Sequence, residues 1–308
     1  MIKGSKLAHH LEYSAIRAAV ALLRRMSFRR AGMIGEWIGA LGFRPLGIRR
    51  AVVERQVRAA FPGLAEDEVL RIARESYENL GRTFIETALL PTYSSEEIVA
   101  LVSRVEGWDV VERARAAGQG FLLVAGHLGN WELGGSYIAS RGIGLEAVAR
   151  RMQNPLFDRY LTETRRRIGV HVIHDADAVK RVPRAVREGR AVGFLFDQGA
   201  AGLASTWVPF FGRYAKTPRG PAVFALRLDV PLIFTAAVRE RDGTYTSYFE
   251  EIAVPRTGNR EADVDMIVAS YTSTLERWVR RYPAQYFWHH RRWKHQRPGT
   301  PPELGDPS

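Results

Sequence analysis

The chain has 308 residues, which is enough for one large domain or for a domain with a helical extension. Its 46% hydrophobic and 10% aromatic content is typical of a globular protein and excludes a disordered one. The absence of cysteine excludes disulfides, thiolate catalysis and thiolate metal ligands. The formal net charge is +12 and arginine dominates the cations, so we expect an anionic partner: an acidic membrane surface, a phosphorylated substrate or nucleic acid.

The N-terminal segment predicts two weakly apolar helices with basic flanks. Between residues 11 and 22 apolar side chains recur on one stripe, while Arg17, Arg24 and Arg25 lie elsewhere. A second apolar segment follows at 33–43, and no window has the roughly 20 apolar residues of a transmembrane helix. We expect an interfacial membrane anchor, with two ordinary packed helices as the alternative.

The rest of the chain divides into a helical part and an alternating part. Helices are predicted at 49–61 and 66–90. Later, strands are predicted at 120–125, 145–149, 170–173, 191–196, 231–238 and 244–252, and helices at 108–117, 131–140, 155–168, 176–188, 218–228 and 261–282. This alternation predicts an α/β domain with a largely parallel core sheet flanked by helices. We therefore expect a helical membrane-associating region at 1–100, a single α/β domain at 101–297 and a disordered tail at 298–308.

The most informative stretch is GHLGNWE at 126–132. It follows an apolar run, so we expect His127 at the carboxyl end of a strand, where open α/β sheets bind ligands. A helix predicted to begin near Asn130 puts Glu132 in its first turn, close to the imidazole. A histidine oriented by a carboxylate is a general base, so we predict catalytic roles for His127 and Glu132. The alternative is a loop histidine that caps a helix.

The nucleophile and the oxyanion site follow from what surrounds this pair. No cysteine and no G-x-S-x-G motif is present, so we expect the substrate's own hydroxyl to attack, without an acyl-enzyme. Backbone N–H groups near Gly129 and Asn130, at a helix start, are expected to hold anionic charge. No metal-ligand spacing occurs, and we predict neither a metal nor a cofactor.

His127-x4-Glu132 is similar to the H-x4-D/E motif of glycerolipid-type acyltransferases. In particular, the chain resembles the lipid A biosynthesis acyltransferase family, which includes the late lauroyl and myristoyl acyltransferases and the mycobacterial phosphatidylinositol mannoside acyltransferases. Four more stretches carry the resemblance, which covers roughly residues 10 to 297: R-x-x-x-N-P at 150–155, D-Q at 197–198, V-P-F-F-G at 208–212 and a W-x-H-R-R-W-K-like signature at 288–294.

These stretches add candidate substrate-binding residues. Asp197 ends a buried strand and is expected to point into the cleft of His127, where it binds a sugar hydroxyl or an arginine. Arg150 ends another strand and is expected to hold a phosphate or the developing oxyanion. The ordinary alternatives are a turn residue and a surface arginine. The resemblance extends the expected substrate site, together with Gly129 and Asn130, to Asn154, Gln198 and Arg291, and the pair Phe210 and Phe211 is expected to line an acyl channel or to be plain core.

The resemblance implies an acyltransferase that moves a fatty acyl chain from acyl-carrier protein or acyl-CoA to a hydroxyl of a lipid A precursor. The implied location is the cytoplasmic face of the inner membrane, with an anionic membrane surface and a glycolipid as partners. One alternative keeps the chemistry and changes the acceptor to a phosphatidylinositol mannoside or another glycolipid, and a hydrolase differs only in using water. A non-catalytic basic membrane-surface or nucleic-acid-binding protein is the alternative from another class, but no nucleic-acid motif supports it.

Overall fold

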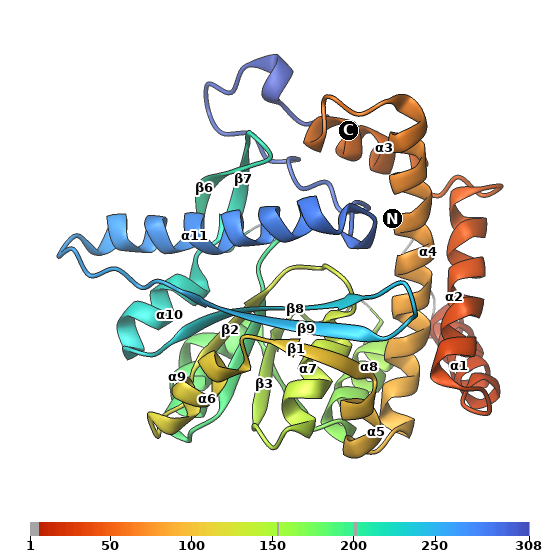
Figure 1. Cartoon of the computed structure of the whole chain (residues 1–308), viewed down its shortest axis with the longest axis horizontal. Coiled ribbons are helices and arrows are strands. Elements are labelled where there is room, and N and C mark those ends of the chain that lie inside the picture. The colour runs from red at the N-terminus through yellow and green to blue at the C-terminus, as the bar shows by residue number, and fades with distance from the viewer. Residues whose placement is uncertain (1–5, 153, 200–201, 308) are drawn as a thin grey trace.

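The computed structural model describes residues 6–152, 154–199 and 202–307. The first five residues of the predicted N-terminal region and the last residue of the predicted tail lie outside this description. A central sheet has α10 and α11 on one side and α6 and α7 on the other, and α4 stands upright beside it (Figure 1). The prediction of a largely parallel α/β fold with a helical N-terminal region is confirmed.

The chain begins with the helices α1 (Lys6–Leu23), α2 (Phe28–Phe43), α3 (Arg50–Ala60) and α4 (Glu66–Leu89). Helix α2 crosses α4 at backbone contact. A Cβ atom at Gly39 would lie 2.0 Å from the carbonyl oxygen of Tyr77, and one at Gly81 would lie 2.2 Å from that of Gly35. Only glycine permits so close a crossing. Of the helices that the structure describes, none is long and apolar enough to cross a membrane.

The main sheet has seven strands in the order β1-β9-β8-β2-β5-β3-β4. They are β1 (Val102–Glu106), β2 (Leu122–Ala125), β3 (Leu145–Ala149), β4 (Val170–His174), β5 (Ala191–Leu195), β8 (Leu232–Arg239) and β9 (Tyr245–Ile252). All neighbouring pairs are parallel except β8 with β9. A separate antiparallel hairpin consists of β6 (Ser205–Phe210) and β7 (Arg213–Pro218).

The helices of this part are α5 (Ser95–Ala100), α6 (Trp108–Ala116), α7 (Trp131–Ser140), α8 (Pro155–Arg167), α9 (Ala178–Arg187), α10 (Gly220–Leu228) and α11 (Arg260–Arg281). Every helix and strand predicted after residue 48 is present, with ends within two residues of the prediction. The prediction lacked α5, β1 and the β6–β7 hairpin. These elements are short, and their residues alternate too weakly between apolar and polar to indicate a strand or helix.

The helical region and the sheet share one hydrophobic core. Val53 of α3 and Ile72 of α4 belong to the same buried cluster as Leu122 of β2 and Leu232 of β8. The chain is therefore a single domain, and residue 100 marks a change of element type and no break in packing.

The C-terminal tail, for which disorder was predicted, contains a 3-10 helix, η4 (Pro302–Leu304), and contacts the body of the protein. Arg213 donates a hydrogen bond to the carbonyl oxygen of Gly305 at 2.8 Å, and Asp306 forms an ion pair with Arg291. These contacts with Arg213 and Arg291 hold the polar tail against the protein, which its composition did not indicate.

Candidate active site

His127 and Asp197 lie side by side because their strands are neighbours. Strands β2 and β5 run parallel, and Ala125 is in register with Leu195. His127 and Asp197 each follow two residues later, at the carboxyl edge of the sheet. Residues 70 apart in sequence thus meet where open α/β sheets place their ligand sites.

The carboxylate of Asp197 holds His127 by two hydrogen bonds. The Nδ1 atom of His127 lies 2.7 Å from Oδ1 of Asp197, and the backbone N–H of His127 donates to Oδ2 at 2.9 Å. Asp197 is only 2% exposed. Burial alone would raise the pKa of Asp197, but the charge and hydrogen bonds of His127 and the charge of Arg292 outweigh it and lower that pKa to about 2. The carboxylate is therefore ionised at neutral pH, and it accepts a hydrogen bond from Nδ1 of His127.

The other ring nitrogen of His127 faces Gln198. Nε2 of His127 lies 3.3 Å from Nε2 of Gln198. The imidazole packs between Trp131, with ring centres 4.8 Å apart, and Phe287, at 5.8 Å. The backbone of Phe287 also donates to the carbonyl oxygen of His127 at 3.0 Å. The ring is held on all these sides, and its side chain remains 16% exposed.

Glu132 does not orient the imidazole, contrary to the prediction. Its carboxylate binds the guanidinium of Arg165 on α8 by two hydrogen bonds, one of them from Nε at 3.0 Å, the other from Nη2. Helix α7 turns Glu132 toward α8, while Nδ1 of His127 already binds Asp197. Arg165 was not singled out from the sequence, because nothing in its helical, arginine-rich surroundings distinguishes it from Arg166 and Arg167.

The main-chain amides of Gly129 and Asn130 are engaged within the protein. Gly129 donates to the carbonyl oxygen of Gln285 at 3.0 Å, and Asn130 donates to that of Ala237 at 2.8 Å. Gly129 has a φ of 65°, and a Cβ atom there would lie 2.0 Å from the Ala237 oxygen, so this turn requires glycine. The prediction that these two amides hold the oxyanion is corrected, because both already donate to backbone carbonyl oxygens of the protein.

The Asn130 side chain is also fully used, so it does not bind substrate in this conformation. The residue is 0% exposed. Its Oδ1 caps α7 by accepting from the amide of Leu133 at 3.0 Å, and its Nδ2 donates to Glu86 of α4 at 3.0 Å. The amide is therefore a bridge between two helices.

A buried ionic cluster around Glu86 lies behind this loop. Its carboxylate accepts from Arg239 at 2.9 Å, from Arg82 at 2.9 Å and from the hydroxyl of Tyr245. Arg82 in turn binds Glu36 of α2 at 2.6 Å. The sequence carried one signal for this cluster: Glu86 falls on the buried face of α4, at helical spacing from apolar residues.

The remaining polar candidates have partners outside the histidine pair. Arg150 is 55% exposed at its side chain and binds Asp175 at 3.2 Å. Asn154 caps α8, where its Oδ1 accepts from two backbone amides, the nearer at 3.0 Å. Arg291 is 43% exposed and binds Asp306, whereas its neighbour Arg292 is 3% exposed and contributes charge near Asp197.

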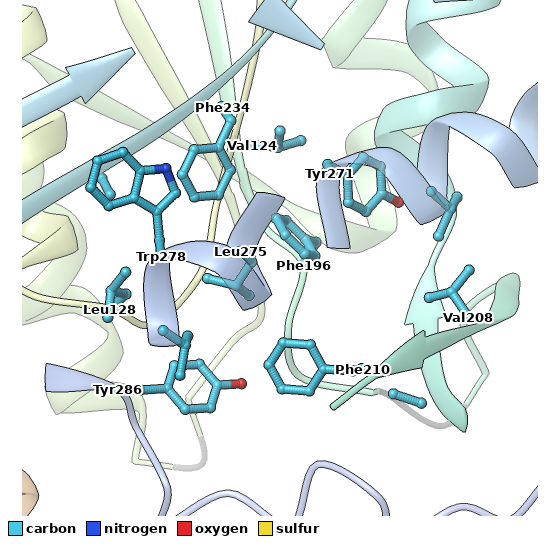
Figure 2. Close-up of a cluster of buried hydrophobic side chains, with 14 of the residues drawn as sticks. Val124, Leu128, Phe196, Val208, Phe210, Phe234, Tyr271, Leu275, Trp278 and Tyr286 are labelled. Atoms are coloured by element: carbon cyan, nitrogen blue, oxygen red, sulfur yellow. The ribbon is translucent and has the colours of Figure 1, made fainter. Parts of the chain in front are cut away.

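Phe210 and Phe211 do not line a channel. They are 0% and 6% exposed and belong to the main core. Figure 2 shows Phe210 beside Tyr286, whose ring centre lies 5.9 Å away. The ring of Trp293 also packs on Phe210, with centres 6.0 Å apart. The plain-core alternative therefore holds for this pair, because the hairpin turns it inward.

An apolar cavity of about 110 Å³ lies between the sheet and α7, next to the histidine loop. Gly126, Leu128 and Trp131, which flank His127, contribute to its wall. Glu132 and Arg165 form its polar part, and glycines on α7 and β5 leave room for it. Among the described residues, no group of three histidine or acidic side chains is arranged to hold a metal ion.

The site thus belongs to an α/β enzyme that combines a histidine–carboxylate pair with an adjoining apolar cavity. The chain is a member of the bacterial lipid A biosynthesis acyltransferase family, whose model matches residues 1–295. It is an acyltransferase accordingly.

Two relatives from Escherichia coli K12 are each 26% identical to this chain. They are the lipid A biosynthesis palmitoleoyltransferase, with 85% of this chain and 84% of the relative covered, and the lipid A biosynthesis lauroyltransferase, with 87% and 86% covered. The phosphatidylinositol mannoside acyltransferase of Mycobacterium tuberculosis H37Rv is 27% identical, with 72% and 70% covered.

Proposed function

We propose that the protein transfers a fatty acyl chain from acyl-carrier protein, or from acyl-CoA, to a hydroxyl of a lipid A precursor, with His127 as the general base. The observation that carries the proposal is the contact between Nδ1 of His127 and the ionised carboxylate of Asp197, 2.7 Å away. Because Nδ1 is engaged with Asp197, Nε2 is the ring nitrogen left to accept a proton from a substrate, as a base requires.

In the proposed reaction, Nε2 of His127 removes the proton of the acceptor hydroxyl while that oxygen attacks the thioester carbonyl. The ester C–O bond forms and the C–S bond breaks. The imidazolium returns its proton to the departing thiolate. Asp197 stabilises the imidazolium during both steps, because its negative charge is buried against the ring. The side-chain amide nitrogen of Gln198 lies 3.3 Å from the reacting nitrogen.

The ion pair of Glu132 and Arg165 is assigned to substrate positioning. Both residues line the apolar cavity, where their partly buried charges lie beside aliphatic side chains. The apolar wall suits the part of the acyl chain next to the thioester. The ion pair then marks the boundary between the acyl chain and the polar groups of the reaction.

The proposed location is the cytoplasmic face of the inner membrane, with peripheral or N-terminal attachment. The N-terminal helices expose the large apolar side chains of Leu22, at 67%, and Trp37, at 65%, and the turn after α2 exposes Leu46, at 65%. Arginines such as Arg29 and Arg30 flank them. Such a mixture suits a headgroup layer that contains anionic lipid.

A second acceptor remains a candidate within the same chemistry. The similarity to a phosphatidylinositol mannoside acyltransferase favours a mannosylated phospholipid as the alternative glycolipid. The choice between carrier protein and CoA is equally open to experiment, because the net charge of +12 suits an acidic protein as well as a phosphorylated nucleotide.

The test is acyl transfer by purified protein in detergent, with radiolabelled lauroyl-carrier protein and a lipid A precursor. We expect His127→Ala to reduce the rate about a thousandfold, since it removes the base. His171→Ala is the matched control, because His171 is an exposed histidine on β4. Acyl-CoA and a mannosylated phosphoinositide serve as the alternative donor and acceptor.

Transfer that survives His127→Ala would overturn the proposed mechanism and leave the family assignment intact. Transfer only to the mannosylated lipid would replace the lipid A precursor by the second acceptor. Release of free fatty acid in place of transfer would identify a hydrolase.

A further inference from the structure

A second and larger cavity lies away from the histidine, between α1, the end of α4 and α8. Its volume is about 530 Å³, within the range of small-molecule sites, which is roughly 300–1,000 Å³. No residue of the 126–132 loop lines it. Helix α8 separates the two cavities: Arg159 and Arg167 face the larger one, while Arg165 faces Glu132 and the smaller one.

The charge on the wall of this cavity is strongly positive. Four arginines line it, with Glu163 as the acidic residue among the lining residues. Glu163 already binds Arg166 at 2.9 Å and Arg167 at 3.2 Å. In the described part of the chain, the three other arginines form no ion pair: Arg17, Arg24 and Arg159. An anion with several oxygen atoms would satisfy them, because guanidinium groups bind phosphate by paired hydrogen bonds.

Most of the remaining wall is apolar, which limits the kind of anion. Val20 and Ala21 of α1 face Ala88, Pro91 and Leu156 across the cavity. At the same cavity the rings of Tyr13 and Tyr160 meet edge to face, with centres 6.1 Å apart. A free inorganic anion makes no use of these surfaces, whereas a glycerol backbone and the first methylenes of two acyl chains would cover them.

We propose that this cavity binds the phosphate headgroup of an anionic membrane phospholipid, with Arg17, Arg24 and Arg159 around the phosphate and the chains along the apolar wall. The neighbouring surface of α1 exposes Leu22, at 67%, which continues the apolar wall outward. A lipid bound here joins α1 to α8 and is not the lipid that is acylated. The proposal therefore does not depend on the acyl-transfer chemistry.

The experiment titrates the full-length protein with dihexanoyl-phosphatidylglycerol, below its micelle concentration, by isothermal calorimetry. Inorganic phosphate and dihexanoyl-phosphatidylcholine are the comparison ligands. We expect saturable binding of phosphatidylglycerol, at least tenfold tighter than that of inorganic phosphate. The double variant Arg17→Ala/Arg159→Ala is expected to bind it about a hundredfold more weakly, roughly tenfold for each charged hydrogen-bond donor removed.

The control is Arg115→Ala/Arg187→Ala, which removes the same charge from exposed positions on α6 and α9. We expect it to bind like the wild type, and we expect Arg17→Lys/Arg159→Lys to recover part of the lost affinity. An equal loss in the control would show that binding follows net charge and would overturn the proposal. Binding of inorganic phosphate as tightly as of the lipid, or no saturable binding, would overturn it as well.

Discussion

The imidazole of His127 is held by a residue from another strand, although an acidic residue five positions away on its own segment looks better placed in the sequence. A helix that begins between them decides the outcome. Glu132 leaves on α7 and meets Arg165 of α8, while parallel pairing of β2 with β5 brings Asp197 to the ring. Strand order, which the spacing of a motif does not contain, therefore determines the partner of the base.

Asp197→Asn tests this assignment at the residue scale. An amide in place of the carboxylate can donate to Nδ1, which favours the tautomer with its proton on Nε2 and removes the charge that stabilises the imidazolium. We expect kcat to fall by about 10²–10⁴. The ¹⁵N chemical shifts of the His127 ring should report the change of tautomer.

Glu132→Gln is the comparison, because it weakens the contact with Arg165 and leaves the bond between His127 and Asp197 in place. Its His127 ring should keep the wild-type ¹⁵N shifts even where its rate falls. If Glu132→Gln changed the tautomer and Asp197→Asn did not, the original prediction of Glu132 as the orienting residue would be restored.

At the scale of elements, helix α4 supports the catalytic loop. Thr83 donates to the carbonyl oxygen of Gly129 at 3.3 Å, and Glu86 binds the side chain of Asn130. The same carboxylate gathers Arg82 and Arg239 in a buried ionic cluster. The loop that carries His127 is therefore bound to the N-terminal helices as well as to the sheet.

Glu86→Ala should be strongly destabilising, because it leaves two buried guanidinium groups without their shared carboxylate. We expect a loss of about 3–5 kcal/mol in the free energy of unfolding, measured by urea denaturation. Glu75→Ala on the same helix is the control. Its side chain is 40% exposed and its ion pair with Arg71 should contribute about 1 kcal/mol or less. Equal losses in the two variants would contradict the assigned role of the cluster.

The elements themselves could be predicted from the sequence because their periodicities are strong and their ends are marked. Pro91 follows the long α4, and glycines follow several other helices. The site could be predicted only in part. His127 at the end of β2 follows from local pattern, but its contact with Asp197 requires the strand order. The burial of Phe210 and Asn130 depends on how the hairpin and the loop turn, and local sequence does not encode those directions.

At the scale of the whole molecule, two partly buried histidines make stability depend on pH. Neither ring nitrogen of His289 finds a hydrogen-bond partner among the described residues, and its ring packs on Tyr77, with centres 4.2 Å apart. Burial lowers the pKa of His289 to about 4, with the charge of Arg49 acting in the same direction, and burial lowers the pKa of His290 to about 4. Both are neutral in the folded protein at pH 7.

Between pH 6.5 and about 4 the unfolded chain binds protons at these positions and the folded chain does not. The free energy of unfolding should therefore fall as the pH falls through this window, by at most about 1.4 kcal/mol per pH unit for each histidine. His289→Phe keeps an aromatic ring on Tyr77 and removes one titrating group. We expect its Tm to fall less steeply between pH 6.5 and 4.5 than that of the wild type.

His171→Asn is the control for this prediction, since His171 is an exposed histidine on β4. Its Tm profile should follow the wild type. Identical slopes for His289→Phe and the wild type would refute the role given to His289.

The glycine crossing of α2 and α4 has a consequence for distances across the whole enzyme. One side of α2 rests on the backbone of α4 through Gly35 and Gly39, and its other side exposes Trp37. Helix α4 in turn touches the loop of His127. A larger residue at Gly39 would push α2 away from α4. The outer face of α2 would then lie farther from His127, although neither that face nor the histidine had been changed. The distance between His127 and the outer face of α2 thus depends on the absence of side chains at Gly35 and Gly39.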